Sequence, residues 1–250
     1  NPGGIFEALN AGVLTGNVII NITADLTGET GTVALNQWTE EPTGSNFTIL
    51  IKPSGAARAI TGTGTNSVVI KLNGADRTTI DGSLSGGTDR SLTISNPNTA
   101  TGTSVLWIGS IGAGAGATND TIKNCIISAG TVGSTSVTTF GVFVGDTTGA
   151  ANGADNDSLT IQNNQILKAT IGIQSIGGAT AGQQDDNLLI DGNTIGDSVV
   201  ANSIGRIGMN VGQATGATVS RNTVLNVVTT DSAITSSNNA RGILISTGTA

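Results

Sequence analysis

The sequence has no histidine, no tyrosine and a single cysteine, and only 2% of its 250 residues are aromatic. A compact globule of this length usually fills its centre with large side chains, so this scarcity favours a thin core of Ile, Val, Leu and Ala. One cysteine excludes a framework of disulfides within the chain. No apolar run approaches the roughly 20 residues that a membrane-spanning helix needs.

Charged residues are also scarce, at 11%, and the 17 acidic residues outnumber the 10 basic ones, which gives a net charge of −7. Nucleic-acid binding requires a basic face, so we expect no nucleic-acid partner. Without histidine, the usual activating base of a nucleophilic cysteine is missing. We therefore interpret Cys125 as a small buried thiol.

A repeat emerges when the strand-like segments are aligned. One apolar position recurs at intervals of 29, 29, 42, 39, 29 and 29 residues. Its members are Ile22, Ile51, Ile80, Ile122, Ile161, Ile190 and Val219. Insertions at 83–89, 112–117 and 145–157 account for the two long intervals.

The later copies share the motif Ile-x-Asn-Asn-x-Ile, as in Ile161-Gln-Asn-Asn-Gln-Ile166, and Cys125 lies in a copy that is one residue shorter. A glycine column precedes each next copy, at Gly141, Gly172, Gly208 and Gly242. Alternation of apolar and polar residues, bounded by Gly and Asn, is typical of half-buried strands.

These strands lack the crossover helices that a βαβ sheet needs, and an antiparallel sandwich would not keep a fixed repeat. The sequence therefore predicts one all-β domain over 1–250, a single-stranded right-handed parallel β-helix of about seven coils stacked ~4.8 Å apart. Asn164, Asn193 and Asn222 then form a structural ladder at a bend, where Asn tolerates left-handed backbone geometry. Trp38 and Trp107 are interpreted as fillers of the coil interior or of a seam, with sugar platforms as the alternative.

The two ends of the coil differ in the sequence. Residues 4–12 have the apolar spacing of a short amphipathic helix, so we predict an N-terminal cap over 1–16 and coils over 17–250. The last strand-like run ends at Ile245 without a comparable cap. An open coil leaves unpaired strand edges, so we expect the natural protein to continue beyond 250.

Several N-terminal segments resemble a known family. They are Ile5-Phe-Glu-Ala-Leu-Asn-Ala-Gly-Val-Leu-Thr-Gly-Asn-Val, Ala34-Leu-Asn-Gln-Trp38, Ile51-Lys-Pro-Ser54 and Leu72-Asn-Gly-Ala-Asp-Arg-Thr-Thr-Ile-Asp-Gly82. They look like the N-terminal half of large bacterial surface proteins, especially of Bacteroidota, that carry right-handed parallel β-helix repeats. The resemblance covers residues 3–96 and implies export to the cell surface or the extracellular space.

The same resemblance suggests sugar attachment. Asp followed by Ser or Thr and a small or apolar residue resembles the O-glycosylation signal of Bacteroidota. Such triplets begin at Asp120, Asp146, Asp157, Asp197 and Asp231. A chain this rich in Asp, Ser and Thr also contains such triplets by chance. The intact mass of natively isolated protein shows whether sugars are attached to them.

No catalytic residues are predicted. Asp185-Asp186 lacks the His and Arg-x-Lys partners of polygalacturonase-like enzymes. A lyase would instead use Arg or Lys as base together with Ca²⁺. The candidate cations Lys123, Arg206 and Arg221 do not stand in a lyase-like motif.

An aspartate corner is the candidate binding site. Asp157 and Asp186 each lie four residues before a column Ile, as does Asp76, and the first two belong to adjacent coils. Asp155, Asn156, Asp157, Asp185 and Asp186 together form an oxygen-rich cluster of the kind that Ca²⁺ prefers. The hypothesis is a calcium site at Asp157 and Asp186, with a solvated loop edge as the alternative.

The residues after the column Ile form a mixed polar face. They are Lys52, Asp81, Lys123, Gln162, Asp191 and Ser220. We expect a non-catalytic extracellular module, structural or adhesive, with polysaccharide or cell-surface components as partners. The alternatives are a polysaccharide lyase or glycosidase and a carbohydrate-binding module, because the fold does not fix the function.

Overall fold

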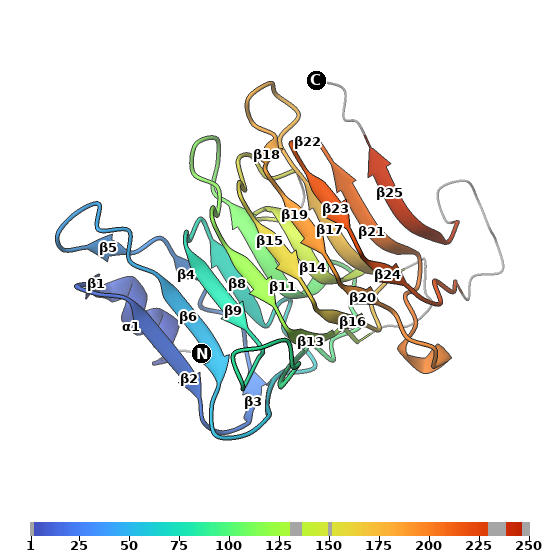
Figure 1. Cartoon of the computed structure of the whole chain (residues 1–250), viewed down its shortest axis with the longest axis horizontal. Helices are drawn as coiled ribbons and strands as arrows, with labels where there is room; N and C mark the ends of the chain where they lie inside the picture. Colours follow the sequence, from blue (N-terminus) through green and yellow to red (C-terminus); the bar gives the residue numbers. More distant parts are fainter. Residues whose placement is uncertain (1–2, 131–136, 150–151, 230–238, 247–250) are drawn as a thin grey trace.

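The computed structural model describes residues 3–130, 137–149, 152–229 and 239–246. It forms a parallel β-helix in which three seven-stranded parallel sheets run side by side along the molecule (Figure 1). Each coil of the chain adds one strand to each sheet in the same order, which gives seven coils and confirms the predicted fold class.

Sheet 1 consists of β2 (Val18–Ile22), β6 (Ile49–Pro53), β9 (Thr78–Asp81), β12 (Thr121–Lys123), β15 (Thr160–Gln162), β19 (Leu189–Asp191) and β23 (Thr218–Ser220). Sheet 2 consists of β3 (Leu26–Glu29), β7 (Arg58–Gly62), β10 (Leu92–Ser95), β13 (Cys125–Ser128), β16 (Gln165–Leu167), β20 (Thr194–Ile195) and β24 (Thr223–Val224). Sheet 3 consists of β4 (Leu35–Asn36), β8 (Ile70–Asn73), β11 (Thr103–Ser110), β14 (Thr139–Asp146), β17 (Ile171–Ile176), β21 (Ile207–Gly212) and β25 (Arg241–Ser246). Two short pairs, β1 (Val13–Leu14) with β5 (Thr39–Glu40) and β18 (Asp185–Asp186) with β22 (Ala214–Thr215), lie beside them, and η1 (Val200–Asn202) is a single 3-10 turn.

The predicted isoleucine column is confirmed from the second coil onward. Ile51 pairs with Ile80, and the partners continue through Ile122, Ile161, Ile190 and Val219. These side chains face the interior, and those from Ile51 to Ile190 are buried. Stacking of identical β-branched residues explains why large aromatic side chains are not needed to fill this core.

The first member of the column was predicted wrongly. Ile20, not Ile22, pairs with Ile51, and Ile22 pairs with Pro53. Ile20 and Ile22 both line the interior because side chains two apart in a strand share a face. The hydrophobic pattern therefore could not distinguish the two registers, and the 29-residue interval to Ile22 was coincidental.

The glycine column marks positions where other atoms approach the backbone closely. A Cβ atom on Gly172 would lie 2.6 Å from Cγ2 of Ile195 and 2.5 Å from the carbonyl oxygen of Gly208. Gly141 and Gly208 have equivalent close contacts with the opposite sheet and with the next coil. Only glycine leaves room here for the isoleucine that crosses the interior from sheet 2.

The N-terminal cap is the helix α1 (Ile5–Ala11), which confirms the expected amphipathic helix. Leu9 is buried against the core and Phe6 packs on it in part. The side chain of Asn10 donates a hydrogen bond from Nδ2 to the carbonyl of Ala34 (2.8 Å) and accepts one from the backbone N–H of Asn36 (2.9 Å). The helix is thus fixed to the first coil beside β4 (Figure 1).

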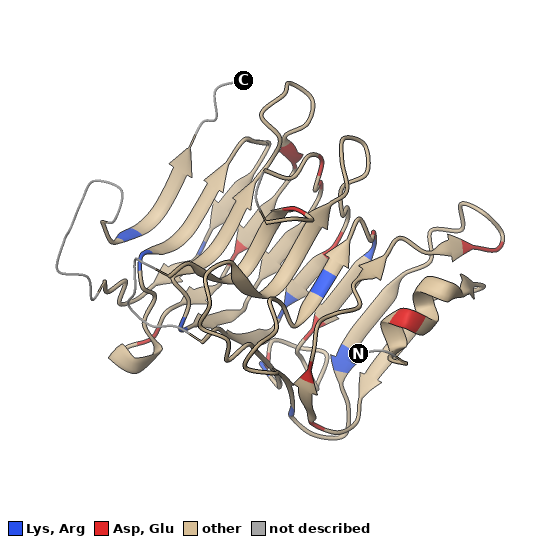
Figure 2. Ribbon diagram, turned by 180° about the vertical axis from the view of Figure 1, so that it is seen from behind, with Lys and Arg blue, Asp and Glu red and all other residues tan. Residues whose placement is uncertain are grey.

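The other end of the described coil is open. Strands β23, β24 and β25 are the outer edges of the three sheets, and Leu225, Ile243 and Ile245 are exposed there. Charged residues are spread thinly along the ribbon (Figure 2). None of the helices in the described ranges combines the length and apolarity that a bilayer crossing demands.

Both tryptophans are buried, as predicted, but in different places. Trp38 belongs to the main core and donates its Nε1–H to Glu40 (3.1 Å). Trp107 packs in a second apolar cluster with Phe140 and Phe143, and its Nε1–H bonds to the carbonyl of Asp146 (2.8 Å). Neither ring is therefore free to act as an exposed sugar platform.

Candidate functional site: a groove on the outer face of sheet 1

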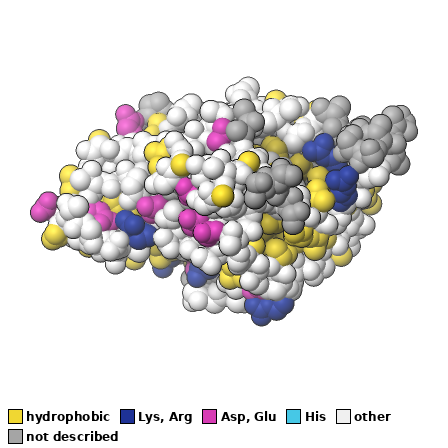
Figure 3. Space-filling model, turned by 90° about the horizontal axis from the view of Figure 1, so that it is seen from above, with side chains coloured by type: hydrophobic (Ala, Val, Ile, Leu, Met, Phe, Trp, Pro, Cys, Tyr) yellow, Lys and Arg dark blue, Asp and Glu magenta, His cyan; other side chains and the backbone are white. Residues whose placement is uncertain are grey.

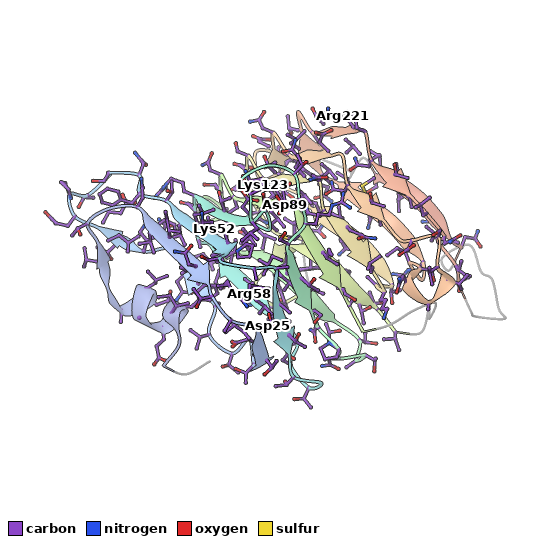
Figure 4. The ribbon with its side chains drawn as sticks, turned by 60° about the horizontal axis from the view of Figure 1, so that its bottom comes forward. Asp25, Lys52, Arg58, Asp89, Lys123 and Arg221 are labelled. Atoms are coloured by element: carbon purple, nitrogen blue, oxygen red, sulfur yellow. The ribbon has the colours of Figure 1, made fainter. Side chains whose placement is uncertain are left out.

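The predicted polar face is a ladder across sheet 1. Asp81 pairs with Lys123, Lys123 with Gln162, Gln162 with Asp191, and Asp191 with Ser220, on five successive coils. Because Ile80, Ile122, Ile161 and Ile190 face inward, the residue after each one faces outward. Lys52 stands on the coil before Asp81, and Figure 4 shows Lys52, Lys123 and Arg221 spread along this side of the molecule.

The charges on the ladder are already paired. Lys123 Nζ lies 3.2 Å from Asp81 Oδ2. Asp191 accepts hydrogen bonds from Arg221 Nε (2.8 Å), from Arg221 Nη2, from Gln162 Nε2 (3.0 Å) and from Ser220 Oγ (2.8 Å). The hydrogen bond with Arg221, followed by those with Gln162 and Ser220, holds the pKa of the Asp191 carboxyl well below its usual range.

The 83–90 loop follows β9 and folds around one carboxylate. Asp89 accepts hydrogen bonds from Ser83 Oγ (2.6 Å), Leu84 N–H (2.8 Å) and Ser91 Oγ (2.7 Å), and also from Ser85. The serine hydroxyls hold the pKa of Asp89 far below its ordinary value. This insertion, noted in the sequence only as a length difference, is therefore a closed loop with its own hydrogen-bonded centre.

The 83–90 loop is also fastened to later coils. Arg90 donates from Nε to the Asn163 carbonyl (2.8 Å) and from Nη2 to Asn163 Oδ1 (3.0 Å). In return, Asn163 Nδ2 donates to the Thr88 carbonyl (2.9 Å) and Asn124 Nδ2 to the Gly87 carbonyl (3.2 Å). Asn124 and Asn163 sit at the end of sheet 1 with φ of 58° and 50°, the left-handed region that Asn tolerates.

The polar ladder and the 83–90 loop together border an open groove of about 390 Å³. Its lining is Gly87, Thr88, Lys123, Asn124, Gln162, Asn163, Asp191, Gly192 and Arg221. The Lys123 side chain is 35% exposed and that of Arg221 is 76% exposed, so both retain donors that face solvent. The groove offers a mixture of donors and acceptors on successive coils, which suits a hydroxyl-bearing polar ligand.

Asp81 and Asp191 do not have the spacing of a glycosidase pair. Asp81 and Asp191 are three coils apart, which corresponds to about 14 Å at the strand spacing of a sheet. Hydrolysis requires two carboxyl groups separated by at most about 9.5 Å. Each of these two carboxylates is moreover engaged by a cation.

A lyase-type base is not evident either. Lys123 and Arg221 are the cations of the groove, and each is held by a carboxylate. Arginine in proteins stays protonated, and the Lys123 ammonium group is engaged by Asp81. Arg206 precedes β21 in sheet 3 and does not line the groove.

At the predicted aspartate corner, Asp157 and Asp186 do lie on adjacent coils. The backbone N–H of Asp186 donates to Asp157 Oδ1 (2.7 Å), and that of Ser158 donates to the Asp186 carbonyl (2.7 Å). Asp76 repeats this arrangement, since its Oδ1 accepts both the N–H and the hydroxyl of Thr118, each at 2.9 Å. The shared spacing of these aspartates thus serves to join one coil to the next.

The remaining corner residues point in different directions. Asp185 is fully buried, and its carboxyl accepts from Asn156 N–H (3.2 Å) and Ser175 Oγ (2.9 Å). The side chain of Asn156 is engaged inside the coil with Ala117 and the Gly145 carbonyl, while Asp155 accepts from Gly114. Seen from above, acidic side chains are scattered from the left end to the middle of this face (Figure 3).

Burial raises the pKa of Asp185 to about 7. Burial likewise raises the pKa of Asp157, with further contributions from the charges of Asp186 and Asp155. Within the ranges that the structure describes, no three acidic, Cys or His side chains converge as metal ligands would. Calcium binding at Asp157 and Asp186 stays a prediction.

The asparagine ladder is confirmed with one correction. Asn193 Nδ2 donates to Asn222 Oδ1 (2.9 Å) and to the Ile161 carbonyl (2.8 Å), and its own Oδ1 accepts the Asn164 N–H (2.9 Å). The left-handed backbone belongs to the preceding residue of each coil, Asn163, Gly192 and Arg221, and not to the ladder itself. The ladder amides point inward, where their hydrogen bonds replace those that the turning backbone loses.

Cys125 heads this ladder, as expected. Its backbone N–H donates to Asn164 Oδ1 (2.9 Å), and its side chain is completely buried. Burial raises the pKa of the thiol far above its ordinary value. Cys125 is therefore an inert packing residue.

The triplets that resemble a glycosylation signal differ in accessibility. Ser198 is exposed, whereas Thr121, Thr147 and Ser158 are partly buried. The triplet at Asp231 lies outside the described residues. Ser198 is the most accessible of these hydroxyls.

Comparisons with protein-family models, with curated proteins and with solved structures give no match to this chain.

Proposed function

We propose that this chain is a non-catalytic extracellular module, structural or adhesive, that uses the groove on sheet 1 to bind a polysaccharide or another hydroxyl-rich surface polymer. The observation that carries this proposal is the ladder from Asp81 to Ser220, in which the charges are paired between coils while solvent-facing donors remain. Paired charges and amides form directional hydrogen bonds with sugar hydroxyls at a smaller desolvation cost than isolated charges.

The rigid scaffold supports the adhesive role. A ligand that follows the groove meets equivalent positions about 4.8 Å apart, because neighbouring coils are strands of one sheet. The 83–90 loop is held by Asp89 and by Asn163, so the wall of the groove is formed before a ligand arrives. Such preorganisation lowers the entropy cost of binding.

Binding to immobilised neutral and uronate-containing glycans tests the proposal. We expect binding by the unaltered chain and a loss of at least about tenfold in the variants Lys123→Gln and Gln162→Ala, since each removes hydrogen-bonding groups from the groove. Lys52→Gln is the matched control, because Lys52 lies in β6 of the same sheet but does not line the groove. Equal binding by the Lys52 and Lys123 variants would contradict the assignment of the site.

An activity screen separates the proposal from the enzyme alternative. Incubation with pectin, alginate and other uronate polymers, with and without Ca²⁺, is expected to yield no new reducing or unsaturated ends. Product formation that disappears in Lys123→Gln would show that the groove is an active site. Labelling of intact cells of the source organism with antibodies against this chain tests the extracellular location.

A further inference from the structure

We propose that the N-terminal end of the coil holds a binding site for an amphiphile with a single apolar chain and an uncharged or cationic head. The site is a cavity of about 360 Å³ between α1 and the interior of the first two coils. It is lined by Gly3, Gly4, Ile5, Phe6, Ile20, Ile22, Leu26, Glu29, Gly31, Val33, Ile51, Ile60, Val69 and Ile70.

The cavity exists because α1 covers only part of the coil end. The helix is fixed beside β4 by Asn10, and Leu9 is the buried residue that it places on the core. The floor is formed by the second coil, with one residue from each sheet: Ile51, Ile60 and Ile70. The second to sixth coils are each stacked between two neighbouring coils, so this space lies at the end of the described coil that carries α1.

The lining determines the chemistry of the ligand. Nearly all of the side chains are aliphatic, and the carboxylate of Glu29 is the charged group among the lining residues. Glu7, on the exposed side of α1, adds a second negative charge close by, since it contacts the Gly3 N–H. A carboxylate or phosphate head would meet like charge here, whereas an alcohol or ammonium head would not.

The volume of the cavity limits the length of the ligand's apolar chain. A dry cavity of about 150 Å³ accommodates benzene, so this one accepts roughly twice that bulk, equivalent to a chain of about ten carbons. Cavities of this size lined by apolar side chains with one polar group are typical ligand sites. Transfer of such a chain from water supplies the driving force.

Titration with decan-1-ol, decylamine and decanoate, each below its micelle-forming concentration, tests the proposal by calorimetry. We expect the alcohol and the amine to bind and decanoate to bind at least tenfold more weakly. Glu29→Gln is expected to reduce this discrimination by at least threefold. Absence of binding by all three compounds, or a preference for decanoate, would overturn the proposal.

The variant Val33→Phe fills the cavity and is expected to weaken binding of decan-1-ol at least tenfold. Val13→Phe is the matched control, because Val13 is exposed on β1 and lies outside the cavity. If Val33→Phe does not fold, shifts of the Ile22, Ile51 and Ile60 methyl resonances on addition of decan-1-ol replace it, and unchanged resonances count against the site. A second copy as occupant would appear as a dimer in sedimentation velocity that decan-1-ol does not dissociate, and that result would also overturn the proposal.

Discussion

At the scale of single residues, polar side chains carry much of the connection between coils. Asn164, Asn193 and Asn222 face a dry interior, yet each amide is matched by a neighbour's amide and by a backbone carbonyl. Buried polar groups are stable only when their hydrogen bonds are complete, so the ladder depends on every member having a partner on a neighbouring coil. This requirement explains why Asn, and not another polar residue, repeats at this position.

Asn193→Ala should destabilise the fold by about 2–4 kcal/mol, because it leaves the buried Asn164 N–H without its acceptor and removes a hydrogen bond to the Ile161 carbonyl. Asn222→Ala, near the open end and only partly buried, should cost about 1 kcal/mol. Urea unfolding followed by circular dichroism measures both. Equal losses of unfolding free energy in the two variants would show that the burial of each Asn does not determine how much it stabilises the fold.

Asp185 should make stability depend on pH in an unusual direction. Its pKa is raised by burial to about 7, above the value of about 3.9 expected in the unfolded chain, so the folded state retains the proton longer. The contribution of protonated Asp185 to the free energy of unfolding is therefore fully present below about pH 4. It is lost as the pH rises to about 7, because Asp185 ionises at a lower pH in the unfolded chain than in the folded one. The loss is on the order of a few kcal/mol.

Asp185→Asn should flatten this slope, since an amide occupies the site without ionising. Asp186→Asn, on the exposed neighbouring residue, should leave most of it in place. Denaturation midpoints of the unaltered chain and of both variants at pH 4.5 and pH 8 measure this pH dependence. A slope unchanged by Asp185→Asn would mean that another buried acid, such as Asp120 with its raised pKa, is responsible.

At the scale of elements, the width of the coil is set by which side chains oppose each other. The side chains of Ile166 and Ile195 in sheet 2 extend across the interior. They pack against Gly141 and Gly172 of sheet 3, respectively. A larger residue on either side would push the sheets apart and break the strand pairing that continues into the next coil. The alternation of Ile and Gly is therefore a packing rule of this chain.

Gly172→Ala should destabilise the protein by about 2–3 kcal/mol, because the added methyl group overlaps the carbonyl oxygen of Gly208 and the side chain of Ile195. Gly64→Ala is the control, since nothing lies within 4 Å of a Cβ atom there and its φ is ordinary. Its effect should stay within about 0.5 kcal/mol. Thermal unfolding of the two variants compares them directly.

The 83–90 loop should lose its fixed shape in Asp89→Ala, which removes the common acceptor of Ser83, Leu84 and Ser91. Amide hydrogen exchange should rise in residues 83–90 while the strands of sheet 1 stay protected. Glycan binding should weaken, because one wall of the groove is no longer formed in advance. Unchanged exchange would show that Arg90 and Asn163 hold the loop by themselves.

At the scale of the whole molecule, the two ends of the described coil have different surfaces. The first coil is covered in part by α1, whereas β23, β24 and β25 are the outermost strands of the described sheets, with Ile243 and Ile245 exposed. Edges of this kind pair with other strands unless they are covered. The seven coils between them act as one rigid support for the groove.

Leu9→Asp should disrupt the cap, because a charge would replace the one side chain that α1 buries in the core. Loss of the cap would expose β2, β3 and β4, and we expect increased hydrogen exchange in the first coil together with self-association. Sedimentation velocity measures the association. Ala8→Asp, at an exposed position of the same helix, should leave the protein unchanged.

The repeat spacing determined the fold and several of its details in advance. Successive coils return equivalent residues to one line even where insertions lengthen a coil, so the isoleucine column from Ile51 onward, the glycine column and the asparagine ladder could be predicted from the repeated segments. The pairing of Ile20 with Ile51 could not, since strand periodicity makes Ile20 and Ile22 equivalent. The role of Asp76, Asp157 and Asp186 in joining coils was also hidden, because a carboxylate that accepts a backbone N–H has no sequence signature of its own.

Only the tertiary structure decided how the groove and the N-terminal cavity are built. Arg90 and Asn163 are 73 residues apart in the sequence but meet because they lie two coils apart, and this contact holds the 83–90 loop in place. The sequence contained Arg221 and Asp191 without indicating that they would pair across neighbouring coils. The cavity depends on where a short helix rests, and such a position follows from three-dimensional packing and not from the period of the chain.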